Sequence, residues 1–149
     1  MLKKYIIMNI NPKNGIDKLI FGMKKNDVEL IYGKPDKFFN DEDDNLIFIY
    51  NKLKLQLNFY EDEDFRLGYI ISSNADLVLS DIKIIALDPE MVKQKLNYKT
   101  WEKEDFDLAE NYFNEENWLI LVSEFNEIVK IELGCIIKND EFDWKFGKK

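Results

Sequence analysis

The chain of 149 residues has no histidine, one cysteine and one arginine. Without histidine it lacks Ser-His and Cys-His nucleophiles, histidine-ligated metal sites and histidine pH switches. Cys135 by itself excludes an internal disulfide and any Cys-x-x-Cys site. A single arginine and a net charge of −8 argue against binding nucleic acid or an anionic membrane surface. We therefore expect no cofactor and no bound metal, and a basic protein as partner.

The N-terminal segment carries two lysines followed by an apolar stretch, residues 5–8, that Asn9 interrupts. This stretch is too short for the core of a signal peptide, and no small-residue cleavage site follows it. No window approaches the roughly 18 apolar residues of a transmembrane helix. The sequence therefore predicts a cytoplasmic protein.

Hydrophobic residues make up 46% of the chain, which is typical of a folded protein, and the length suits a single domain, residues 1–149. A short helix is expected over residues 24–32, because Val28, Ile31 and Tyr32 share one helical face and Gly33 follows as a stop. Strands are expected at residues 45–50, 53–60 and 66–72.

The second half repeats this order of elements. Residues 82–87 are expected to be extended, and Asp88 and Pro89 are typical of the start of a helix that ends near Leu96. Strands are expected at residues 106–112, 118–123 and 127–137. The predicted fold is α+β, an antiparallel meander sheet with two short helices on one face.

Similar residues recur between the halves at offsets of 62 to 64 positions: Val28 and Val92, Tyr50 and Tyr112, Asp64 and Asn126. This pattern indicates two tandem repeats, residues 16–75 and 80–138. The alternative is one α+β domain that happens to alternate helix and meander.

The segment FGMKKNDVELIYGKPD, followed by a hairpin and FYEDEDFRLGYI, resembles the helix-plus-meander module of β-lactamase-inhibitor-protein-like domains. Outer-membrane assembly lipoproteins and some bacterial immunity proteins have the same module. Gly22-Met23 and Gly33-Lys34-Pro35 match its pattern, whereas Lys24 replaces the expected Ser or Thr cap. The resemblance implies tandem modules and transfers no functional residue.

Acidic residues occur in runs, and two kinds of chemistry come into question for them: calcium binding and glycoside hydrolysis. Asp41, Asp43 and Asn45 have the spacing of calcium-loop ligands, but the loop glycine and the twelfth-position glutamate are missing. A carboxylate pair in a cleft would be needed for glycoside hydrolysis. Solvated charge in hydrophilic turns is the ordinary interpretation of such runs.

The negative charge is concentrated in the second half. Residues 1–75 hold 11 basic and 12 acidic side chains, and residues 76–149 hold 10 and 17. The window between Trp101 and Trp118 mixes acids with aromatic rings, a combination that suits a basic partner. The candidate partner-binding residues are Glu102, Glu104, Asp105, Asp107, Glu110, Tyr112, Phe113, Glu115 and Glu116.

The alternative is that the aromatic residues of this window are sheet core, which we expect for Phe106 and Trp118. Tyr112 and Phe113 are adjacent, so in a strand one of them must point away from the core. In the tail, Phe142, Trp144 and Phe146 are spaced two apart and predict an extended segment. That segment either docks on the sheet or serves as an arm for a partner or for self-association.

Cys135 is expected to be a small buried core residue, since no basic neighbour lowers the pKa of its thiol. Together these observations predict a non-enzymatic cytoplasmic binding protein, specifically an immunity protein that neutralises a basic toxin such as a nuclease. The alternatives are a structural or assembly module of the same fold and a carboxylate-based hydrolase. The sequence leaves the oligomeric state open.

Overall fold

The computed structural model describes residues 7–147, so most of the N-terminal stretch considered above, residues 3–6, lies outside the described residues. The first half contains β1 (Met8–Asn11), β2 (Gly15–Ile16), β3 (Leu19–Ile20), α1 (Lys25–Tyr32), β4 (Lys37–Asn40), β5 (Leu46–Tyr50), β6 (Leu55–Tyr60), the 3-10 turn η1 (Glu61–Glu63) and β7 (Arg66–Ser72). The second half contains β8 (Leu77–Leu79), β9 (Ile82–Lys83), α2 (Pro89–Lys95), β10 (Trp101–Phe106), β11 (Ala109–Asn114), β12 (Leu119–Glu124), β13 (Glu127–Gly134), β14 (Ile137–Lys138) and β15 (Glu141–Phe142).

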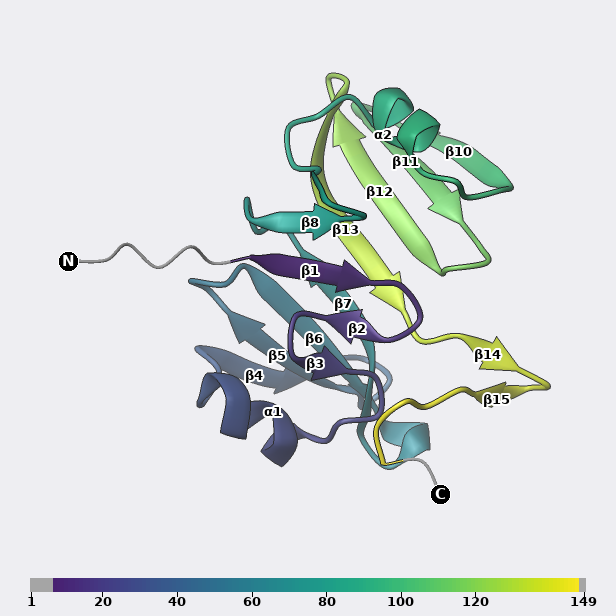
Figure 1. Cartoon of the computed structure of the whole chain (residues 1–149). Helices are drawn as coiled ribbons and strands as arrows, with labels where there is room; N and C mark the ends of the chain where they lie inside the picture. The colour runs from purple at the N-terminus through teal and green to yellow at the C-terminus, as the bar shows by residue number, and fades with distance from the viewer. Residues whose placement is uncertain (1–6, 148–149) are drawn as a thin grey trace.

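The main sheet has eight strands in the order β10-β11-β12-β13-β7-β6-β5-β4, and all its neighbours are antiparallel (Figure 1). It consists of two four-stranded meanders that join through β7 and β13. A smaller sheet has the order β3-β2-β1-β8-β9, and β14 and β15 form a separate hairpin. The predicted α+β class, antiparallel sheet and two helices are confirmed.

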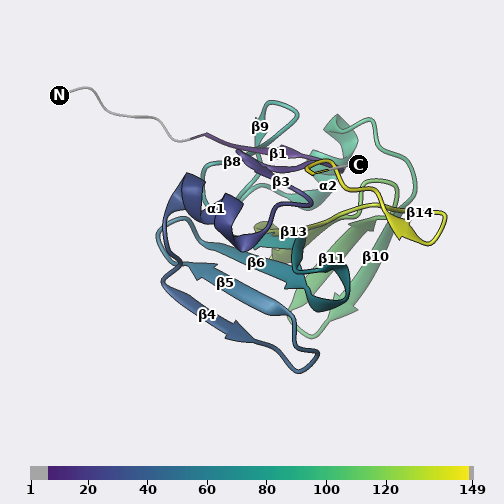
Figure 2. The same ribbon diagram turned by 90° about the horizontal axis from the view of Figure 1, so that it is seen from below.

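Both helices and the smaller sheet lie over the same face of the main sheet (Figure 2). The core fills the space between these layers, and Val28 of α1 and Val92 of α2 are both completely buried in it. The smaller sheet was not predicted, because its strands have only two to four residues. One of its pairings, β1 with β8, is parallel.

Both helix ends follow their local sequence. Lys24 replaces the expected N-cap side chain of α1, and the Asp27 carboxylate instead accepts a hydrogen bond from the Lys24 backbone N–H at 2.9 Å. Gly33 ends the helix with φ +79°, a conformation that favours glycine. Asp88 caps α2 by accepting a hydrogen bond from the Glu90 backbone N–H at 2.8 Å. No helix among residues 7–147 is long and apolar enough to cross a membrane.

The predicted strand at residues 106–112 is wrong, because this stretch contains a turn. Asp107 has φ +48°, and the chain reverses so that Phe106 pairs with Ala109. The acidic residues on its N-terminal side form β10, the outermost strand of the main sheet. The strand boundaries expected in the first half agree with β5, β6 and β7 to within two residues.

The last two strands of each meander have an irregularity in their pairing. In the first meander, the register of β6 and β7 shifts next to the pair Phe59–Leu67. In the second, the register of β12 and β13 shifts next to the pair Ser123–Ile128. Leu67 exchanges backbone hydrogen bonds with Gly22 and Met23. Ile128 does the same with Ala86 and Leu87, so each meander is joined to the segment before its helix in the same way.

Candidate functional site

The face of the main sheet opposite the helices is largely uncovered (Figure 2). Among the described residues, only the β14–β15 hairpin lies near this face, at one end (Figures 1 and 2). Strand alternation sends Tyr112 into the core, where it is 2% exposed, and the adjacent Phe113 to the open face. This confirms the expectation that one of these two rings must point away from the core.

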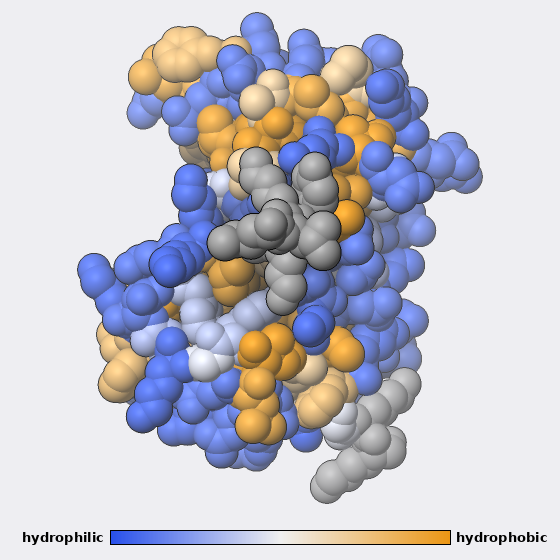
Figure 3. Space-filling view, turned by 60° about the vertical axis from the view of Figure 1, so that its left-hand side comes forward, coloured by the Kyte–Doolittle hydropathy of each residue, from blue (hydrophilic) through white to orange (hydrophobic). Residues whose placement is uncertain are grey.

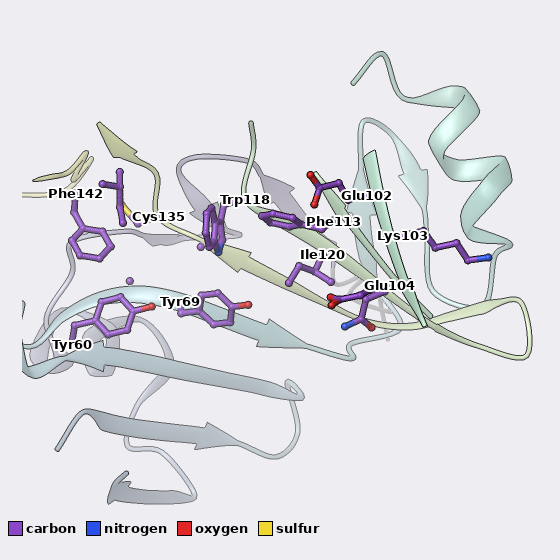
Figure 4. Close-up of a pocket in the computed structure, with 14 residues that line it drawn as sticks. Tyr60, Tyr69, Glu102, Lys103, Glu104, Phe113, Trp118, Ile120, Cys135 and Phe142 are labelled. Atoms are coloured by element: carbon purple, nitrogen blue, oxygen red, sulfur yellow. The ribbon is translucent and has the colours of Figure 1, made fainter. Parts of the chain in front are cut away.

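A groove of about 550 Å³ crosses this open face (Figure 4). Five aromatic side chains line it, contributed by β6, β7, β11, the turn before β12, and β15. Two glutamates of β10 lie at one end of the groove. These seven lining residues are Tyr60, Tyr69, Phe113, Trp118, Phe142, Glu102 and Glu104.

Two of the rings lie directly on glycines of the central strands. A Cβ at Gly68 would come within 2.2 Å of the Tyr60 ring, and one at Gly134 would come within 2.2 Å of the Trp118 ring. Because these glycines carry no side chain, both rings can lie close to the backbone. Gly68 and Gly134 therefore set the depth of the groove.

The β11–β12 turn holds Trp118 in place. The Asn114 side chain accepts hydrogen bonds from the backbone N–H of Asn117 at 3.2 Å and from its side-chain amide at 2.9 Å. Asn114 also donates to the Lys99 carbonyl at 2.6 Å. Both asparagines are buried, which fixes the turn, and Trp118 follows it with φ +44° and packs edge-on against Phe113 at 5.1 Å between ring centroids. Trp118 is thus a preorganised ring, 38% exposed, at the centre of the groove.

The two tyrosines of the groove are uncharged at neutral pH. Burial raises the pKa of Tyr60 to about 12. Burial and the hydrogen bond that the Tyr69 hydroxyl donates to Glu132 raise the pKa of Tyr69 as well. The charged groups at the groove are therefore Glu102, Lys103 and Glu104.

Glu102 and Glu104 project from β10 on the groove side, opposite Phe113 and Asn111 (Figure 4). Neither carboxylate forms an ion pair with a described residue. The Lys103 side chain between them extends away from the rings and binds Glu110 at 2.7 Å. The groove thus ends in two unneutralised negative charges beside aromatic faces.

The structure places the predicted binding residues in different environments. Glu102, Glu104 and Phe113 line the groove. Tyr112 is a core residue, and Glu110 is on the helix side of the sheet, where Lys103 lowers the pKa of its carboxyl group. The remaining members of the predicted set are exposed outside the groove: Asp105, Asp107, Glu115 and Glu116.

Two interpretations of aromatic residues need correction. Phe106 and Trp118 are 51% and 38% exposed and do not belong to the sheet core, because one precedes the β10–β11 turn and the other follows the β11–β12 turn. Tyr60 and Tyr69 were not predicted for the site. Tyr60 is the last residue of the alternating strand β6, and Tyr69 follows the register shift in β7. The sequence does not reveal that shift, so only the pairing of β6 with β7 shows which face of the sheet the two tyrosines occupy.

The tail folds back on the first half and does not extend as a free arm. The backbone N–H groups of Lys145 and Phe146 both donate to the Phe21 carbonyl. Arg66 donates to the carbonyls of Gly22 and Phe146, at 3.1 and 3.4 Å. Phe142 consequently stands at one end of the groove, 5.5 Å from the Tyr60 ring between centroids.

Cys135 is 4% exposed, which confirms the expected burial, and this burial raises the pKa of its thiol to about 12.

The residues at Asp41 that have the spacing of calcium ligands form a turn. The Asp41 carboxylate accepts hydrogen bonds from the backbone N–H groups of Asp43 and Asn45, both at 2.9 Å, and so shapes the β4–β5 turn. Residues 7–147 contain no group of three or more side chains placed to hold a metal ion.

Figure 3 shows another side of the molecule, turned by 60° about the vertical axis from the view of Figure 1. In the space-filling view, hydrophobic residues gather in an upper and a lower area separated by hydrophilic ones (Figure 3). Exposed apolar side chains of the helices and turns are scattered, with Leu30 of α1 87% and Phe125 77% exposed. Such isolated residues are normal on protein surfaces.

The fold and groove define an α+β protein built on one large antiparallel sheet. No protein-family model matches the sequence, and no curated protein matches it. The structure is similar to an extracellular protein containing an SCP domain from Bacillus anthracis, with a TM-score of 0.55 and 15% identity over 90% of this chain. It is also similar to a cysteine-rich secretory protein from Staphylococcus aureus, with a TM-score of 0.52 and 9% identity over 87% of this chain. The chain spans half the length of each.

These similarities overturn two expectations. The resemblance to β-lactamase-inhibitor-protein-like and immunity-protein modules is wrong, since the structural neighbours are SCP-domain proteins. The short Gly-Met and Gly-Lys-Pro markers specify a helix and its stop, which unrelated folds share. The predicted cytoplasmic location is also contradicted, because both neighbours are described as extracellular or secretory.

Proposed function

We propose that this chain is a non-enzymatic binding module that holds a basic segment of a partner protein in the aromatic groove. The observation that carries the proposal is the combination of five aromatic side chains with the carboxylates of Glu102 and Glu104, which form no ion pair within residues 7–147, on one face of the sheet. Aromatic faces attract lysine and arginine, and buried rings supply most of the affinity at protein interfaces. Carboxylates at the rim accelerate encounter with a basic partner.

The immunity interpretation depended on the small size of the chain, on its acidic and aromatic window and on the family resemblance, and the family resemblance has been corrected. A basic partner does not depend on that resemblance, because it is inferred from the charge and the groove. Both structural neighbours are described as extracellular or secretory, and we propose the same setting for this chain.

Binding is better supported than hydrolysis at this site. Glycoside hydrolysis needs a carboxylic acid and a carboxylate that flank the scissile bond, with the acid's pKa raised by its surroundings. Glu102 and Glu104 are two residues apart on one edge strand, so they project side by side, and both are exposed. This arrangement suits a cation better than a bond that must be attacked from two sides.

We further propose that residues 16–75 and 80–138 are tandem repeats. An offset of 64 relates Val28 to Val92, Leu57 to Leu121, and Gly22 to Ala86. An offset of 61, after a shorter turn, relates Leu67 to Ile128. These pairs support duplication because their members have matching burial or matching backbone hydrogen bonds. In this alignment Tyr112 corresponds to Phe48, whereas the sequence suggested Tyr50.

The binding proposal is tested by selecting displayed random 12-residue peptides on the folded protein and measuring the affinity of the peptides obtained. We expect peptides rich in arginine or lysine with apolar neighbours. Trp118→Ala should weaken them roughly tenfold, because it removes the central ring. Gly134→Ala, which displaces that ring without deleting it, should weaken them in the same direction.

The charge is tested with a matched pair of variants. Glu102→Gln with Glu104→Gln should lower affinity roughly threefold to fivefold at low salt, and less at high salt. Glu115→Gln with Glu116→Gln removes the same charge outside the groove and should leave affinity unchanged. Peptides that are not basic, or that bind folded Trp118→Ala as tightly as the parent protein, would contradict the proposal.

A further inference from the structure

The groove continues beyond Tyr60 and Phe142. These two side chains also line a second hollow, of about 590 Å³, at the end farthest from β10. Its other lining residues come from the β4–β5 turn and from η1: Asp43, Asp44, Asn45, Asp62 and Glu63. The two adjoining hollows share Tyr60 and Phe142, and together they have an aromatic middle and carboxylates at both ends.

The carboxylates of the second hollow are also unneutralised. None of its four acidic side chains forms an ion pair with a described residue. They do not converge as metal ligands, since no metal-binding group of three or more exists among residues 7–147. Dispersed carboxylates at the rim of an aromatic groove suit an ammonium or guanidinium group better than a metal ion.

The distance between the two acidic ends limits the occupant. The two hollows together cross six adjacent strands, from β10 through β11, β12, β13 and β7 to β6. Five spacings of about 4.8 Å amount to about 24 Å across the strands, and the row of residues through Glu102 meets β6 at Gln56, four residues or about 13 Å along the strand from Tyr60. The two ends are therefore about 27 Å apart. An extended chain advances about 3.3 Å per residue, so seven residues cover about 23 Å, and a long cationic side chain at each end bridges the rest. A helix of seven residues would span only about 10 Å.

Building on the proposed function, we infer that the groove holds one extended segment of about seven residues with a cationic side chain at each end and apolar side chains between them. One cationic group lies beside Glu102 and Glu104, and the other lies beside Asp62 and Glu63. The apolar middle packs on Trp118, Tyr69 and Tyr60. The two acidic ends set the spacing of the basic residues that the module recognises.

The test uses labelled seven-residue peptides of leucine and serine that contain two arginines separated by one, three or five residues. Their composition and charge are identical, so only spacing differs. Fluorescence anisotropy at low salt should show that the peptide with five intervening residues binds roughly threefold to fivefold more tightly than the one with a single intervening residue. Asp62→Asn with Glu63→Gln should remove this preference.

The outcomes separate this inference from the proposed function. Equal affinities for the three spacings, all weakened by Trp118→Ala, would overturn the two-ended occupant and leave the basic-segment groove standing. No binding at millimolar concentration, or binding that Trp118→Ala does not alter, would overturn both. A spacing preference that persists in the Asp62→Asn, Glu63→Gln variant while Glu115→Gln with Glu116→Gln is neutral would also overturn the two-ended occupant.

Discussion

The two halves of this molecule share a core and differ at their edges. Each has a short helix followed by a four-stranded antiparallel meander, and the meanders meet at β7 and β13. The outer strand of the first half, β4, exposes Phe38 at 71%, whereas the outer strand of the second half, β10, exposes Glu102 and Glu104. Buried positions are constrained by packing, while an edge strand is free to acquire a surface for a partner.

The largest expected effect tests whether the halves share one core. Leu57 in β6 and Leu121 in β12 correspond in position, and both are completely buried in the same cluster. Leu57→Ala and Leu121→Ala should each lower the free energy of unfolding by about 2–5 kcal/mol, through lost burial and the cavity left behind. Urea denaturation followed by circular dichroism should show one transition in both variants.

Leu30→Ala is the matched control, because Leu30 is 87% exposed and the same atoms are removed. Its effect should stay within about 0.5 kcal/mol. Two separate transitions in either core variant would show that the halves unfold independently and do not share one core.

An intermediate effect on stability is expected where a strand side chain holds the segment that follows each helix. The Tyr50 hydroxyl donates to the Gly33 carbonyl at 2.8 Å, and the corresponding Asn114 donates to the Lys99 carbonyl at 2.6 Å. Tyr50→Phe should cost about 1 kcal/mol, the value of one hydrogen bond. Asn114→Ala should cost about 1–3 kcal/mol, because it also leaves the buried Asn117 without its partner.

Thermal unfolding checks both variants, and tryptophan fluorescence adds a second measurement. Asn114→Ala should change the emission because Trp118 follows the same turn, whereas Tyr50→Phe should leave it unchanged. Equal costs and unchanged emission in both variants would mean that Asn114 has no role in positioning Trp118.

The smallest change in the free energy of unfolding at neutral pH is expected for Tyr60→Phe. The folded-state pKa of Tyr60 is raised from 10.0 to about 12 by burial, so this residue stabilises the fold fully below pH 10. That stability is lost as the pH rises through 12, because the unfolded chain releases the proton more readily. Denaturation at pH 8 and pH 11 should show a smaller alkaline loss of stability in Tyr60→Phe than in the parent protein. An identical loss would assign the alkaline sensitivity to other tyrosines.

The sequence predicted more of the fold than of the site. Alternation in residues 53–60 and the Asp88-Pro89 start of α2 indicated their elements because each signal is local. The β10–β11 turn was missed because the alternation of apolar and acidic residues continues through Phe106, Asp107 and Leu108. For the site, Glu102, Glu104 and Phe113 were predicted from charge and aromatic content. Tyr60 was not, because its position in the groove depends on pairing with a strand that follows a five-residue connection.

By itself the sequence determined that the chain lacks histidine chemistry, that it is acidic mainly in its second half, and that one of Tyr112 and Phe113 must face away from the core. These properties follow from composition and from the alternation of side chains along a strand. The tertiary structure decided which carboxylates stay unpaired and which rings meet. Lys103 forms an ion pair with Glu110 on one face of β10, while Glu102 and Glu104 on the other face form none with the residues that the structure describes. Only the pairing of β7 with β13 brings Tyr69 and Trp118 from separate halves into one groove.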